Sequence, residues 1–359
     1  MAVNLDALKD APRLLMEASL KPVQGERFQP TGFPDLGAAT YTLPDGTEML
    51  LVESAQSMAN RLEQVCWDEA KGDLFASLQG LPYVRVDLGD FGETASVLEF
   101  HRLNSPYIWG GDGPDGKTAD FRTAVCKSLG LKGDEWKGKK GTDGAEPPGA
   151  LDLRKLARTA LQYDPSCILH GVFLEKVAGR FRLSRLLSAF IEARGVRAAE
   201  SGGVKFDRVI PAKGVAGVTS EQGYTNVTFP RTEFTAESIT AYFNLDLTGL
   251  RGYGLGEAAE RMLITLALWK IRRFLETGLR LRTACDLDCV GLTVTRPEGF
   301  EVPPLADLDA AVSKTIAACA QAGMFADPPV TRITWKTPKP RRGGESKGEA
   351  EPESEPEEE

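Results

Sequence analysis

The residues with the clearest chemical potential are hydroxyl and amide side chains gathered in one short stretch. Four of them, and the first basic residue that follows, are Ser54, Gln56, Ser57, Asn60 and Arg61. The apolar residues between them recur at helical spacing, which predicts a helix with one buried stripe and an uncharged polar face. Ser54 is a natural N-cap for this helix. Backbone N–H groups and the helix dipole favour an anion at this end. The polar face could therefore contact a phosphate, and the alternative is that it simply faces water.

Two basic segments add the charge that an anion-binding groove would need. Residues 180–213 hold eight basic side chains against three acidic ones, and residues 261–282 hold six against one, so each has a net charge of +5. The whole chain has a formal net charge of −8, but the local field matters more for binding. The alternative is a pair of amphipathic helices with basic outer faces. The candidate phosphate contacts outside the polar stretch are Lys21, Arg180, Arg182, Arg185, Arg272, Arg273, Arg280 and Arg282.

The stretch 279–282 alternates leucine and arginine, which is typical of a strand with one buried face. Leu279 and Leu281 would face a helix layer, and Arg280 and Arg282 would stand on the open side of the sheet. A four-stranded sheet with helices on one face leaves its other face free for single-stranded nucleic acid. The arginines could instead protect a sheet edge against strand pairing. No RNP-type aromatic pattern is present, so base stacking of the ordinary RRM kind is not expected.

The remaining elements mix strands and helices, so the chain is predicted to be α+β. Helical spacing predicts helices at 150–163, 183–194 and 254–278, the last ended by Gly278. Alternation predicts strands near 16–24, 82–89, 96–103, 167–175 and 279–287, a hairpin within 32–54 and a long projecting hairpin near 204–232. Residues 110–149 are predicted to be an insertion with one short helix at 118–129. Residues 336–359 are predicted to be a disordered, charged tail.

Several function classes are disfavoured by the composition. With 42% hydrophobic and 26% charged residues, the chain is typical of a soluble globular protein. The six cysteines are scattered and only two histidines are present, so neither a zinc site nor a disulfide framework is expected. Asp286 and Asp288 are a conceivable divalent-metal pair, although turn chemistry explains them as well. No cofactor is expected. No apolar run reaches membrane-spanning length and no secretory start is visible, so we expect a cytoplasmic protein without membrane contact.

Four blocks of the sequence resemble one known family. They are "MEASLKPVQGERFQPTGFPDLGAATY", "VESAQSMANRLE", "GRFRLSRLLSAFIEARGVR" and "LTGLRGYGLGEAAERMLITLALWKIRRFL". In this order they resemble the backbone subunit of the type I-G (formerly I-U) CRISPR surveillance complex, Cascade, in the RAMP superfamily. The resemblance implies an RRM-like (ferredoxin-like) palm with an antiparallel sheet, helical insertions and a projecting hairpin, the thumb. The domain would span residues 1–335, with the thumb near 204–232 and a rival position at 72–100.

The resemblance also implies a function in antiviral defence. Copies of the subunit would stack as a helical filament along the guide RNA (crRNA), beside other Cascade subunits, in a non-catalytic ribonucleoprotein. They would hold the guide backbone while its bases pair with a target DNA strand. In relatives the serine and glutamine that start the helix contact guide phosphates, and Ser54, Gln56 and Ser57 match them. Ala59 and Asn60 stand where relatives often carry a basic residue, which makes Arg61 the substitute candidate.

Two other classes of function remain open at this point. One is a metal-dependent ribonuclease of the RAMP type, which cuts target RNA with an aspartate such as Asp286, Asp288 or one in the 110–120 loop. The other is a self-assembling structural protein that binds no nucleic acid. A cleavage assay and the absorbance ratio of the purified complex would separate them from pure RNA binding.

Overall fold

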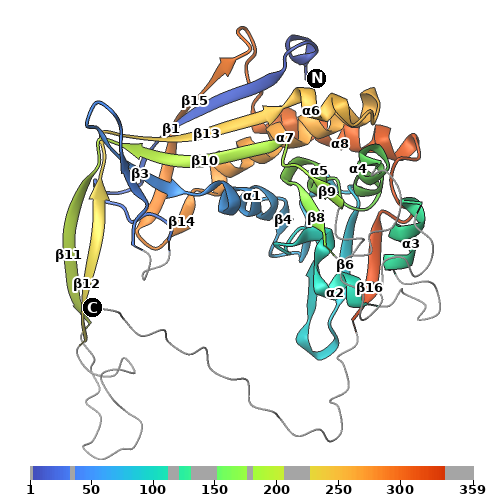
Figure 1. Ribbon diagram of the computed structural model, residues 1–359, viewed down its shortest axis with the longest axis horizontal. Helices are drawn as coiled ribbons and strands as arrows, with labels where there is room; N and C mark the ends of the chain where they lie inside the picture. The colour runs from blue at the N-terminus through green and yellow to red at the C-terminus, as the bar shows by residue number, and fades with distance from the viewer. Residues whose placement is uncertain are drawn as a thin grey trace, which may run out of the picture.

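The fold is known from a computed structural model that describes residues 3–32, 37–111, 121–130, 152–175, 181–205 and 227–335. It is α+β, as predicted, and its largest element is a curved antiparallel sheet (Figure 1). The sheet has seven strands where the sequence suggested four. Their spatial order is β14 (Arg280–Arg282), β15 (Cys285–Arg296), β1 (Arg13–Pro22), β13 (Ser238–Asp246), β10 (Leu187–Arg194), β3 (Glu48–Glu53) and β2 (Thr40–Thr42).

Alternation along the central strands gives the sheet one buried face. In β13, Ile239, Ala241, Phe243 and Leu245 are buried, and the residues between them are partly exposed. The adjacent strand β10 follows the same pattern in register, with Leu187 opposite Leu245. Because strand side chains point alternately to the two faces, the buried residues of these strands form a single apolar layer.

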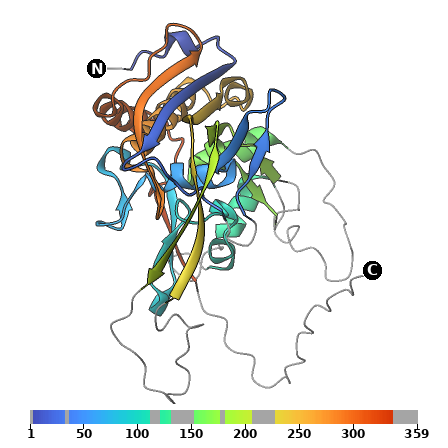
Figure 2. The ribbon, with the colours of Figure 1, turned by 90° about the vertical axis from the view of Figure 1, so that its left-hand side faces the viewer.

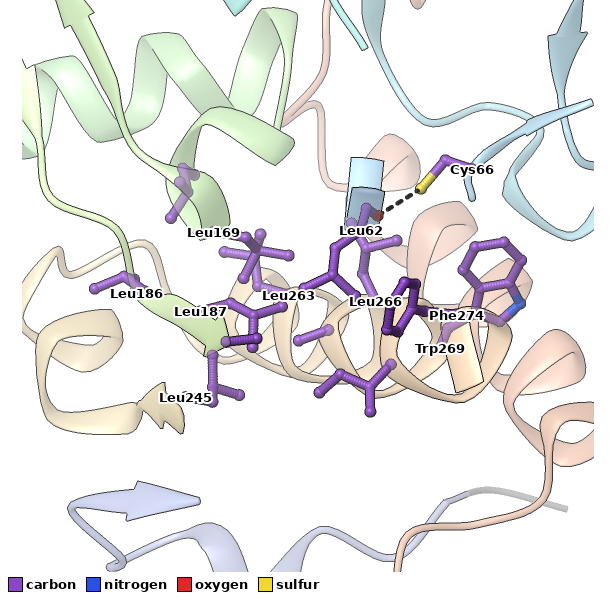
Figure 3. Packing of buried hydrophobic residues seen from close by; sticks show 14 of the residues in the cluster. Leu62, Cys66, Leu169, Leu186, Leu187, Leu245, Leu263, Leu266, Trp269 and Phe274 are labelled. Atoms are coloured by element: carbon purple, nitrogen blue, oxygen red, sulfur yellow. Dashed lines mark hydrogen bonds between the residues drawn. The ribbon is translucent and has the colours of Figure 1, made fainter. Parts of the chain in front are cut away.

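Two helices cover this layer, α1 (Ala55–Gln64) and α7 (Glu257–Thr277), and α8 (Leu305–Gln321) packs against α7. Helix α7 was predicted from its apolar middle, and it is buried along almost its whole length. Figure 3 shows Leu263 of α7 between Leu187 of β10 and Leu62 of α1, with Leu266 and Phe274 further along the same helix. Along the chain the order is β1, α1, β10, β13, α7 and β15, and the four strands lie side by side as β15-β1-β13-β10.

A long hairpin leaves the sheet between β10 and β13. Its strands are β11 (Arg197–Lys205) and β12 (Val227–Thr235), which pair antiparallel from Arg197 opposite Thr235 to Lys205 opposite Val227. Figure 2 shows these two strands extending away from the helices and the main sheet. The predicted hairpin is therefore present, although it begins at Arg197 rather than near 204. Its tip, 206–226, lies outside the described residues.

The remaining elements form a second layer beside α1 and α7. A small sheet joins β16 (Val330–Thr334), β6 (Tyr83–Asp87) and β7 (Glu93–Ala95), with β16 parallel to β6. Part of the rival thumb segment 72–100 therefore pairs within the body. Helix α3 falls inside the predicted insertion and buries Phe121 and Val125 in the common core. The other elements of this layer are β4 (Trp67–Asp68), β5 (Asp73–Leu74), α2 (Pro106–Gly110), α3 (Phe121–Ser128), α4 (Leu153–Tyr163), α5 (Ser166–His170), β8 (Val172–Leu174) and β9 (Phe181–Leu183). The short helix α6 (Leu247–Gly252) instead follows β13 and contacts β1.

Two predicted elements are wrong and a third is partly wrong. Residues 183–194 were expected to be helical, but 187–194 form strand β10, because the alternating burial of Leu187, Ala189, Ile191 and Ala193 outweighs the helix propensity of leucine and alanine. Residues 167–175 were expected to be a strand, but the chain is helical to His170 and only Val172–Leu174 form a strand, β8. Short apolar runs are ambiguous between a buried strand and a buried helix. Residues 96–103 form turns and a 3-10 helix, Arg102–Asn104, instead of a strand.

Candidate nucleic-acid interface

Helix α1 begins at the cap that the sequence predicts. Ser54 has extended backbone angles, and its hydroxyl accepts a hydrogen bond from the Ser57 backbone N–H at 3.3 Å. Met58 and Leu62 are fully buried against the core, whereas Gln56 is exposed and Ser57 is half-buried. The polar residues of the stretch therefore point outward together, and the first turn of the helix presents no acidic side chain.

Three neighbouring hollows lie around this outward face, and each shares lining residues with the next. The central hollow, of about 260 Å³, is lined by Ser57, Asn60, Arg61 and Gln64 on one side and by residues 97–100 on the other. Toward the C-terminal end of α1 it shares Arg61 and Gln64 with a hollow of about 440 Å³. Toward the N-terminal end it shares Phe100 with a hollow of about 470 Å³. We call these three hollows together the α1 groove.

Arginines from distant segments line both ends of the α1 groove. Arg182 and Arg185 line the N-terminal hollow, and Arg273 and Arg280 line the C-terminal one. Arg185 donates from Nη1 to the carbonyl oxygen of Ala55 at 2.7 Å, which fixes its guanidinium at the first turn of α1. The helix start and this guanidinium therefore both favour an anion at the same place.

Arg61, the expected substitute for a basic phosphate contact, is held by hydrogen bonds to other residues of the protein. Its Nε donates to a carboxylate oxygen of Glu53 at 2.8 Å, and its Nη2 donates to the carbonyl oxygen of Leu281 at 2.8 Å. Glu53 is buried, so its charge offsets that of Arg61. Arg61 lines the groove but brings little net charge to it.

The other candidate residues lie elsewhere. Arg272 donates to the carbonyl oxygens of Val302 and Pro303. Arg282 donates to the carbonyl oxygen of Pro30 and lines a separate hollow of about 650 Å³ at the base of the β11–β12 hairpin. Lys21 is exposed on β1, opposite Asp288 of β15, and Arg180 falls outside the described residues.

The stretch 279–282 is only partly as predicted. Leu279 and Leu281 are buried, as expected. Arg280 and Arg282 do not line one common hollow, because the short edge strand β14 is irregular between them. Asp286, one of the two conceivable metal ligands, stands opposite Arg280 in the register.

A charged cluster lies behind α1, in the interior. Glu63 accepts from the Arg102 Nε at 2.8 Å, and both side chains are almost completely buried. Lys270 is fully buried and lies 2.9 Å from the Ser166 hydroxyl and 3.0 Å from Nε2 of His170. Burial raises the pKa of Glu63 to about 7, despite Arg102, and burial lowers the pKa of His170 well below its ordinary value.

Sequence reasoning missed part of the α1 groove. Gln64 follows Asn60 by one helical turn, so the spacing could have identified it. Phe100 and Asn104 were assigned to or near a strand, and only the folded chain brings them beside β8 and β9. Lys270 was counted as part of a basic segment, yet its charge is entirely interior.

The chain matches one family model. Residues 14–198 match the model of CRISPR-associated protein GSU0053 (Cas_GSU0053). The chain belongs to this family. The matched range contains α1, Arg182 and Arg185, so the N-terminal half of the α1 groove falls within the family region. The resemblance to a CRISPR-associated protein is thereby confirmed.

Solved structures give weaker likenesses. A chain of "CRISPR RNA-guided surveillance complex, pre-nicking" is 13% identical, with a TM-score of 0.38, and the match covers 87% of this chain and 89% of that one. Csc2 of Thermofilum pendens is 12% identical, with a TM-score of 0.29 and coverage of 90% and 80%. Both TM-scores are too low to establish a shared fold. No curated protein matches the chain, and no described helix is long and apolar enough to cross a membrane.

Proposed function

We propose that this family member is a non-catalytic backbone subunit of a type I-G Cascade complex and that it binds guide RNA along the α1 groove. The observation that carries the proposal is the groove itself. Polar side chains of α1 lie at its centre beside Glu99, and unrelated segments bring arginines, together with some acidic side chains, to both of its ends. Neutral donors suit close contact with a sugar–phosphate backbone, and the flanking arginines supply attraction that does not depend on sequence.

The strand and helix order supports an RRM-like palm. The four strands β15-β1-β13-β10, with α1 after β1 and α7 after β13, follow the β-α-β-β-α-β plan of ferredoxin-like folds. The β11–β12 hairpin, inserted between the second and third strands of this plan, is our candidate for the thumb. On this proposal residues 1–335 form the subunit domain and 336–359 a separate charged tail.

The proposed assembly is a filament on RNA. Copies of the chain stack along one crRNA beside other Cascade subunits, and the guide bases that face away from the grooves pair with the target DNA strand. Head-to-tail contacts that do not close give open filaments, so the guide length would set the number of copies. A single copy on a long guide RNA would contradict this part of the proposal.

The test is a salt titration of RNA binding by the full chain, with several single-stranded RNAs of unrelated sequence. Replacing Arg182 and Arg280 together with alanine removes one exposed cation from each end of the groove. We expect affinity to fall about equally for all RNAs, and the slope of log K against log salt to flatten by about one to two. Arg13→Ala is the control, since Arg13 is exposed but lines none of the three hollows.

Gln56→Ala tests the neutral part of the groove. Loss of one hydrogen bond should cost on the order of 1 kcal/mol of binding and leave the salt slope unchanged. If both variants bind RNA like the parent, the α1 groove is not the RNA site. Incubation with Mg²⁺ should leave the bound RNA intact, and cleavage would favour the ribonuclease alternative.

A further inference from the structure

The N-terminal hollow of the α1 groove has features that phosphate binding does not explain. It lies between residues 100–104 and the β8–β9 hairpin, and its volume is about 470 Å³. This is within the range of about 300–1,000 Å³ that small-molecule sites occupy. The hollow is therefore large enough for a planar group, not only for a phosphate.

Two exposed aromatic rings line the hollow. The side chain of Phe100 is 73% exposed and that of Phe173 is 37% exposed. Arg182 reaches from β9 over the Phe173 ring, with its Cζ 4.7 Å from the ring centroid. Nucleobases stack on aromatic rings and on guanidinium planes, and this stacking tolerates any base.

We propose that this hollow is a nucleobase subsite, which takes one base of the single-stranded RNA bound along α1. The proposal rests on the proposed function, because the RNA must follow the groove to reach the hollow through Phe100. The base stacks on the Phe173 ring and the Arg182 guanidinium, with the exposed Phe100 ring at the entrance of the hollow. Every base has a π-face that can stack, so the subsite accepts any sequence.

The experiment compares two RNAs of equal length on the full chain. One is an intact single-stranded RNA, and the other has abasic sugars throughout, so that it keeps every phosphate. Phe173→Leu keeps the apolar volume and removes the ring. We expect it to weaken binding of the intact RNA about tenfold and binding of the abasic RNA less than about twofold. Phe91→Leu is the matched control, since Phe91 is 76% exposed and lines none of the three hollows.

Phe100→Leu is the second variant and protects the test against misfolding of the first. This variant should also weaken binding of the intact RNA more than binding of the abasic RNA. Equal weakening with both RNAs, or no weakening in either variant, would overturn the base subsite while the RNA-binding proposal stands. Failure of the parent chain to bind either RNA would overturn both proposals.

Discussion

The two sides of helix α1 contrast in an unusual way. Its outward face carries neutral side chains, with Gln56, Ser57 and Asn60 in the first two turns. Its inward side carries a charge, Glu63, which meets the buried guanidinium of Arg102. An ordinary surface helix has apolar residues inside and charges outside, so α1 departs from it by placing Glu63 among its buried apolar residues and neutral side chains outside.

This contrast separates two uses of charge in the molecule. The interior charges of Glu63, Arg102 and Lys270 are held by partners within the chain and cannot attract a ligand directly. The exterior keeps its charge at the ends of the groove, on Arg182 and Arg280, where both side chains are exposed. Changes inside should therefore alter stability, and changes outside should alter binding.

The largest expected effect comes from removing the interior cation nearest α1. Arg102→Met leaves Glu63 buried without its partner, so the free energy of unfolding should fall by about 3–5 kcal/mol near pH 8. Denaturant titration measures this loss. Arg13→Met is the control, because the ion pair of Arg13 with Asp246 is largely exposed and should be worth less than about 1 kcal/mol. Equal losses in the two variants would remove the contrast between interior and surface charges.

The pH dependence of the free energy of unfolding should show that burial raises the pKa of Glu63. Its pKa is about 7 in the folded chain and 4.5 for an unperturbed carboxyl, so the folded state binds more protons between these pH values. Stability contributed by this group therefore falls as the pH rises from 4.5 to 7, by on the order of 3 kcal/mol.

Comparison of the parent chain with Glu63→Gln isolates this contribution. The parent should gain stability relative to the variant as the pH falls from 8 to 5. His170 acts in the opposite direction, since its lowered pKa makes the folded state resist protonation below its ordinary value of 6.5. The His170 effect is common to both chains and cancels in the difference. A difference that does not change with pH would show that Glu63 stays ionised.

The smallest effect concerns Ser54, which caps helix α1 and is also a candidate phosphate contact. Ser54→Ala removes the cap and should cost about 1 kcal/mol of stability. Ser54→Asp keeps a capping oxygen and suits the helix dipole, so its stability should match the parent. If a phosphate lies at this helix start, the added negative charge should nevertheless weaken RNA binding, as measured by the same titration. Normal RNA affinity in the aspartate variant would place the phosphate elsewhere.

Local sequence determines several elements of this protein without help from the rest of the chain. The cap at Ser54, the apolar stripe of α1 and the long apolar run of α7 each carry their own signal, and all are present. The β11–β12 hairpin and the hairpin of β2 and β3 are likewise readable from alternation and turn residues. These signals are local because helices and hairpins pair residues that are near one another in the sequence.

Tertiary structure decides what local patterns leave open. Strand β10 has helix-forming residues and becomes a strand only because β13 and β3 offer partners on both sides. Net charge per segment likewise does not reveal which cations reach solvent. Lys270 is buried against Ser166 and His170 and Arg272 is bound to backbone carbonyls, whereas Arg182 and Arg280 stay exposed. Burial and hydrogen bonding join residues that are a hundred or more positions apart, and no window of sequence contains that information.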